Sequence, residues 1–105
     1  MKKVKNFRQY HLEKLKTLKA ARVYLEVALE EFEKDHDKDT FLQAIRDVAE
    51  AQGGLSLLAK RAGLNRQNLY KALSARGNPQ FDTIGAILQA LGFRLSVELL
   101  SRKAA

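Results

Sequence analysis

The tripeptide Gly63-Leu64-Asn65 constrains the fold of this chain most, because it separates two short runs of apolar residues at helical spacing. Gly63 can adopt the positive φ angle that ends a helix, and the side-chain oxygen of Asn65 can cap the next one. Leu64 and Leu69 have the spacing of a hydrophobic staple around that cap. Residues 54–74 are therefore predicted to form two short helices joined by a tight turn, the arrangement of a helix-turn-helix motif.

The second predicted helix of this motif, residues 66–74, has an apolar face and a polar face at 3.6 residues per turn. The polar face carries side chains that can bind phosphates and base edges, namely Arg66, Gln67, Tyr70, Lys71 and Ser74. An ordinary solvated helical hairpin can carry such a face as well. Residues 51–80 hold five basic residues and no acidic residue, which favours a DNA-facing surface.

The pattern Ala59-x-x-x-Gly63-Leu64-Asn65-x-x-x-Leu69 resembles the helix-turn-helix of the phage-repressor (Xre) superfamily. Over roughly residues 7–100, the chain is similar to the HigA-like addiction-module antidotes, with the resemblance carried by YLEVALEE and by the run from FLQAIRDVAE to GFRLSVE. This resemblance implies a dimeric, sequence-specific DNA-binding antitoxin. Such a protein represses its own toxin-antitoxin operon and neutralises a RelE-like toxin.

The resemblance also implies that the second motif helix enters the major groove of double-stranded DNA. The residues predicted to contact base edges are Arg66, Gln67 and Lys71. The residues predicted to contact the DNA backbone are Asn65, Asn68, Tyr70, Lys60, Arg76 and Ser56. Members of the superfamily often begin the first motif helix with a phosphate-binding Gln, where this chain has Leu55. Ser56 or the amides of Gly54 and Leu55 are expected to replace that contact.

Helical periodicity predicts an all-α, phage-repressor-like bundle of about five or six helices, followed by a C-terminal β-strand. Besides the motif, helices are expected over residues 8–15, 18–33, 40–51 and 81–91. The side chains of the last helix expected to face inward are Phe81, Ile84, Ile87, Leu88 and Leu91. Thr17 is an expected N-cap, and Thr40 forms a predicted capping box with Gln43. Gly92 is expected to end the last helix.

The C-terminal β-strand is predicted because apolar and polar side chains alternate over residues 93–99. Its apolar positions are Phe93, Leu95, Val97 and Leu99. Since no second strand is predicted in the chain, this strand is expected to pair with its twin in a homodimer or with a strand of the toxin. The alternative is a strand that lies apolar side down on the helices and leaves an edge bare.

Charge is distributed unevenly along the chain, whose net charge is +7. Residues 1–24 hold eight basic residues and one acidic residue, whereas residues 25–50 hold nine acidic and three basic residues. This layout predicts two surfaces for two partners, with DNA on the acid-free stretch and a protein on the acidic one.

The acidic stretch includes a row of glutamates on the polar side of the 18–33 helix, Glu26, Glu30 and Glu33. They form either a solvated face or a docking face for a basic toxin.

The expected organisation is one domain with flanking segments. Residues 1–17 form a basic N-terminal segment, either a solvated tail or an arm that touches phosphates. Residues 18–100 form a single helix-turn-helix domain with an N-terminal helical extension, and residues 101–105 form a tail.

Several classes of function are disfavoured by the residues present. There is no cysteine, and neither His11 nor His36 has a matched catalytic partner in the sequence. The acidic run at 35–39 resembles the start of a calcium loop, but Thr40 replaces its glycine and Arg46 its bidentate glutamate. No apolar run approaches the ~20 residues needed to span a bilayer, and no signal peptide is evident.

The sequence therefore predicts a cytoplasmic bacterial protein that is not an enzyme and uses no cofactor, metal or membrane. Two alternatives to the antitoxin remain open. One is a stand-alone Xre-family repressor, and the other is a toxin-binding inhibitor with weak DNA binding.

Overall fold

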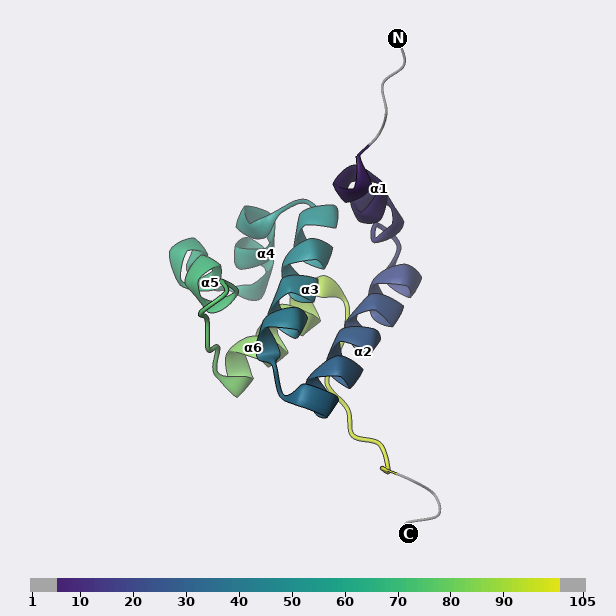
Figure 1. Ribbon diagram of the computed structural model, residues 1–105. Coiled ribbons are helices and arrows are strands. Elements are labelled where there is room, and N and C mark those ends of the chain that lie inside the picture. Colours follow the sequence, from purple (N-terminus) through teal and green to yellow (C-terminus); the bar gives the residue numbers. More distant parts are fainter. Residues whose placement is uncertain (1–5, 101–105) are drawn as a thin grey trace.

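The computed structural model describes residues 6–100, and every regular element in that range is a helix (Figure 1). Its six helices are α1 Phe7–Lys14, α2 Leu18–Asp35, α3 Lys38–Ala51, α4 Leu55–Ala62, α5 Arg66–Ala72 and α6 Phe81–Leu91. The predicted all-α class and the helices expected from periodicity are thus confirmed. The predicted tail at 101–105 and the first five residues of the predicted basic segment lie outside the described range.

Helix α3 is the centre of the bundle because it is buried over most of its circumference. Seven of its 14 residues are buried, and α1, α2 and α4 all pack against it. Helix α4 in turn contacts α5 and α6, so α2 and α5 lie on opposite sides of the central helix (Figure 1). The largest fully buried side chains come from α3, α6 and the segment of α5, and they are Leu42, Ile45, Val48, Leu69, Leu73 and Ile87. One hydrophobic core therefore fixes the α4–α5 pair to the rest of the molecule.

Most predicted helix boundaries match the observed caps. The hydroxyl of Thr17 accepts a hydrogen bond from the amide of Ala20 at 3.1 Å, and Gly92 ends α6 in the left-handed conformation. The predicted capping box at Thr40 is wrong, because α3 begins at Lys38. The carboxylate of Asp37 accepts from the amide of Asp39 at 3.0 Å and acts as the N-cap instead. Aspartate caps as well as threonine does, so the earlier position starts the helix.

The predicted β-strand over residues 93–99 is also wrong. Residues 93–100 form no strand with any other part of the described chain, and they leave the end of α6 as an irregular segment (Figure 1). Alternating side chains produce a strand only when a neighbouring strand satisfies the backbone amides and carbonyls, and the described residues contain no such neighbour. Phe93 packs partly on the core, whereas Val97 and Leu99 are 97% and 77% exposed.

Phe81 departs from the predicted inward stripe of α6. Its side chain is 79% exposed, while Ile87, Leu88 and Leu91 are buried as expected. Side chains in a helix lean toward its N-terminus, so a residue at the first position extends beyond the helix instead of packing beneath the next turn. The buried stripe of α6 therefore starts one turn later, at the partly buried Ile84.

A buried carboxylate connects the first three helices. Asp47 on α3 is only 3% exposed, and it accepts hydrogen bonds from the hydroxyl of Tyr24 on α2 at 2.6 Å and from the guanidinium of Arg8 on α1 at 2.8 Å. The side-chain amide of Gln43 donates a third, also at 2.8 Å, and His11 Nε2 lies 3.6 Å away. We call these five residues the Asp47 network. Since α1 has no buried residue of its own, the network holds that helix against α3.

The protonation of the network follows from its contacts. Burial acts to raise the pKa of Asp47, but the hydrogen bonds from Tyr24, Arg8 and Gln43 outweigh burial and leave that pKa below its usual value. Burial, together with the hydrogen bond to Asp47, raises the pKa of Tyr24 to about 12. The network is therefore an ionised carboxylate that accepts from a neutral phenol around neutral pH.

Candidate nucleic-acid interface

The turn between α4 and α5 fixes the direction of α5 through local backbone geometry. Gly63 has a φ angle of 69°, the left-handed conformation expected for the residue that ends α4. The side-chain oxygen of Asn65 then accepts from the amide of Asn68 at 3.0 Å and caps α5. Leu69 is buried on the inner side of α5, and Leu73 is buried just after its end. The predicted pair of helices with a three-residue turn is thus confirmed.

The three residues predicted to contact base edges lie together on the outer side of α5. Arg66, Gln67 and Lys71 are all exposed, and they line one shallow hollow together with Tyr70. The hollow combines a guanidinium, an ammonium, a side-chain amide and a phenol. These groups can donate hydrogen bonds to phosphate oxygens and to base edges.

The other five predicted DNA contacts lie outside this hollow, at the start of α5 and on the elements beside it. Asn65 and Asn68 stand at the start of α5, and the cap leaves the side-chain amide nitrogen of Asn65 as its remaining donor. Ser56 is in the first turn of α4 and Lys60 in its last turn, while Arg76 is in the loop after α5. All five side chains are exposed and available to a partner. No side chain caps α4 at Gly54, so the first amides of that helix keep free donors.

The electrostatic character of this surface is uniform. None of the five basic residues in 51–80 forms an ion pair with a carboxylate of residues 6–100. Their charges are therefore not neutralised within the described structure, and the surface attracts anions.

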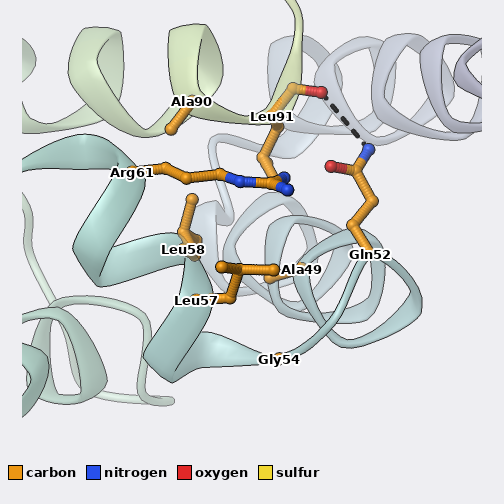
Figure 2. A pocket seen from close by; sticks show the side chains of 8 residues that line it. All are labelled: Ala49, Gln52, Gly54, Leu57, Leu58, Arg61, Ala90 and Leu91. Carbon is orange, nitrogen blue, oxygen red and sulfur yellow. Dashed lines mark hydrogen bonds between the residues drawn. The ribbon is translucent and has the colours of Figure 1, made fainter.

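Arg61 is the one of these five basic residues that lines the junction of α4 with α6. Its side chain extends between the two helices toward Leu91, where Gln52 donates a hydrogen bond to the Leu91 carbonyl at 3.2 Å (Figure 2). The recess around it is too narrow for a water molecule, so it offers no small-molecule pocket. The aliphatic stem of Arg61 instead covers the apolar side chains at this junction.

Two further observations bear on the chemistry available to the chain. Within residues 6–100, no three His, Cys, Asp or Glu side chains gather to hold a metal ion. None of the helices in the same range is both long and apolar enough to cross a membrane.

Sequence reasoning missed the Asp47 network. One signal was available, since Asp47 stands among the buried positions of α3 beside Val48, where an unpaired carboxylate would be costly. Its partners could not be inferred, because Arg8 and Tyr24 are 39 and 23 residues away and no local spacing connects them.

Comparison with known proteins identifies the family of the chain. The family described as probable addiction module antidote protein matches residues 4–99. A protein of Haemophilus influenzae, described only as uncharacterized, is 35% identical over 74 residues, which cover 70% of this chain and 75% of that protein. No solved structure matches the chain. Because the family match spans nearly the whole length, the chain belongs to the family described as probable addiction module antidote protein.

Proposed function

We propose that this protein is a sequence-specific DNA-binding antitoxin that represses its own operon and neutralises a RelE-like toxin. The exposed side of α5 supports this proposal most, because it gathers Arg66, Gln67, Tyr70 and Lys71 on a helix that Asn65 caps and the core holds in place. Membership of an antidote family calls for a toxin as the second partner. The protein acts by binding alone, without a catalytic group or cofactor.

In this proposal the α4–α5 pair is an Xre-type helix-turn-helix, and α5 lies in the major groove. Arg66 and Lys71 bind guanine O6 and N7, and Gln67 binds adenine N6 and N7. Phosphates are bound by the exposed polar side chains on either side of α5, namely Asn65, Asn68, Tyr70, Lys60, Arg76 and Ser56. Such backbone contacts set the position of the helix on DNA, whereas the base contacts supply sequence preference.

A homodimer completes the proposed reader of the operator. Two copies related by a two-fold axis would present two α5 helices to half-sites about 34 Å apart on a palindromic operator. A second candidate function is a toxin-binding inhibitor with weak DNA binding. The exposed acidic side of α2 favours it, because carboxylates there suit a protein partner and repel DNA.

Fluorescence anisotropy tests the DNA-binding part of the proposal. Labelled DNA from immediately upstream of the gene is compared with a scrambled duplex over a series of salt concentrations. Phosphate contacts predict a linear fall of log K with log salt for both duplexes. We expect the upstream duplex to bind ~10³-fold more tightly or better, as specific sites do. Equal and weak binding of both duplexes would reject sequence-specific repression and favour the inhibitor.

The antitoxin function predicts a small reading frame beside the gene, and co-expression with that frame tests it. We expect that frame to arrest growth when expressed alone and growth to resume when this protein is expressed with it. Full DNA binding without any rescue of growth would indicate a stand-alone repressor.

A further inference from the structure

The outer side of α2 carries two apolar side chains that are only half buried in the described chain. Val23 and Val27 lie one helical turn apart and are 54% and 50% exposed, whereas Ala21, Leu25 and Ala28 are buried on the opposite side of the helix. Valine is a weaker helix former than alanine because its branched Cβ loses rotational freedom. The two valines form a small apolar patch whose remaining exposed area a protein partner can bury.

Carboxylates surround the pair on the second half of the helix. At 100° per residue, Glu30 and Glu31 fall on either side of Val27, and Glu26 is also close. Two of the three have weak intrahelical pairs, from Arg22 Nε to Glu26 at 3.3 Å and from Lys34 Nζ to Glu31 at 3.9 Å. These contacts are exposed and contribute little to stability.

Glu30 forms no ion pair with any residue in the described part of the chain. We define the α2 face as Val23, Val27, Glu26, Glu30 and Glu31. Lys19 and Lys34 lie on the same stripe of the helix, so the three carboxylates outnumber the basic groups by one. The face has an apolar centre and a small excess of negative charge, which is complementary to a basic surface around an apolar patch.

The α2 face is remote from the candidate nucleic-acid interface. Helix α2 packs on α3, and the α4–α5 pair lies beyond α3 on the other side (Figure 1). The small excess of carboxylates on the α2 face favours a basic protein over DNA phosphates as its partner. A protein bound there leaves the exposed residues of α5 uncovered.

We propose that the α2 face docks the cognate toxin through a basic surface with an apolar centre. This inference rests on the proposed antitoxin function and names the surface that performs it. Burial of Val23 and Val27 supplies binding free energy, and the carboxylates steer and orient the basic partner. A single molecule can then hold toxin on α2 and DNA on α5 at the same time.

The test is isothermal titration calorimetry of the full chain with the purified protein encoded beside its gene. The double substitution Val23→Ala and Val27→Ala is expected to weaken binding at least tenfold, without lowering the melting temperature, since alanine favours the helix. Glu30→Lys with Glu31→Lys is expected to weaken binding and to reduce its dependence on salt. The controls are Leu100→Ala, which shortens an exposed apolar side chain outside α2, and Glu98→Lys, which reverses an exposed charge there.

Each outcome separates this inference from the function on which it rests. If the wild-type chain does not bind the neighbouring protein, the antitoxin function itself fails. If the wild-type chain binds the neighbouring protein and the α2 variants bind it equally well, the antitoxin function stands and the α2 face is not the docking site. The same conclusion follows if only the control variants bind more weakly. Light scattering measures whether a second copy of this chain occupies the α2 face instead. A dimer that becomes a monomer on Val23→Ala with Val27→Ala would show that the face joins two copies of this chain, and the inference would be overturned.

Discussion

Two groups of charged residues in this molecule differ in whether the protein itself supplies their hydrogen-bond or ion-pair partners. In the Asp47 network, the buried carboxylate is satisfied from inside the protein by groups on three helices. On the outer side of α5, Arg66 and Lys71 have no acidic partner in the described structure. The first arrangement can be explained by the fold alone. The second leaves cations on one surface without an internal partner, so they are available to an anionic ligand.

Substitutions in the two groups are therefore expected to affect different properties, DNA binding in one case and folding in the other. Changes on α5 should alter binding and leave folding intact, whereas changes at Asp47 should alter folding and leave the affinity of the folded protein intact.

The largest effect is expected from Arg66→Ala combined with Lys71→Ala. Each residue is proposed to make a base contact worth about 1–3 kcal/mol, so operator affinity should fall about 30-fold or more. The melting temperature should stay unchanged, because both side chains are exposed and unpaired. Anisotropy and thermal unfolding measure the two quantities, and Arg94→Ala is the control for loss of an exposed cation. Loss of stability in the double variant would show that α5 charges also support the fold.

A somewhat smaller effect, on stability, is expected from Asp47→Asn. The substitution keeps the size of the side chain but removes the charge and leaves buried hydrogen-bonding groups unsatisfied, at a cost of about 2 kcal/mol. Urea unfolding measures this loss, and Glu50→Ala is the control, because Glu50 is an exposed partner of Arg8 at 2.5 Å. Weaker DNA binding by Asp47→Asn at temperatures where the variant remains folded would show that the Asp47 network also supports the DNA interface.

Asn65 combines an internal hydrogen-bond partner with a position at the proposed DNA interface. Asn65 lies at the proposed DNA interface, yet its side-chain oxygen is used inside the protein to cap α5. Asn65→Ala should therefore reduce stability by about 1 kcal/mol and also weaken DNA binding through imperfect placement of α5. Asn65→Asp restores the cap while adding a negative charge. If the aspartate variant regains stability but not DNA affinity, the two roles of Asn65 are separate.

The smallest effects are expected in the pH dependence of stability and lie outside the neutral range. Because the pKa of Asp47 is lowered on folding, its contribution is complete above the unfolded value of about 3.9 and is lost as pH falls through the lower folded value. The pKa of Tyr24 is raised to about 12, so its contribution is complete below the unfolded value of about 10 and is lost as pH rises toward 12. Urea midpoints measured across pH reveal both limits. Tyr24→Phe should remove the alkaline limit attributed to Tyr24, and persistence of that limit in the variant would assign it to other groups.

What could be predicted from sequence was mainly what depends on neighbouring residues. The spacing around Gly63 and Asn65 predicts the observed turn, because a left-handed glycine and a side-chain cap act within a few residues. The exposed cluster on α5 follows from the same local geometry, since helical spacing decides which side chains share a face.

The errors arose where the outcome depends on distant or absent neighbours. A strand at 93–99 requires a second strand, and no local pattern supplies one. The Asp47 network joins residues from three helices, so only the packing of the bundle brings Arg8 and Tyr24 to the carboxylate. The start of α3 was misplaced for a milder reason, because Asp37 and Thr40 are both good caps and the sequence alone does not rank them.

The lack of any buried residue in α1 has a consequence for how the molecule opens. An eight-residue helix is unstable by itself, so α1 remains folded only while Arg8 and its partners hold it. Its amides can therefore exchange with deuterium through a local opening, whereas the amides of α3 exchange only when the whole core separates. We therefore expect two cooperative units in the described chain, with the boundary near the buried Leu15. Native-state hydrogen exchange would resolve them as two free energies of opening.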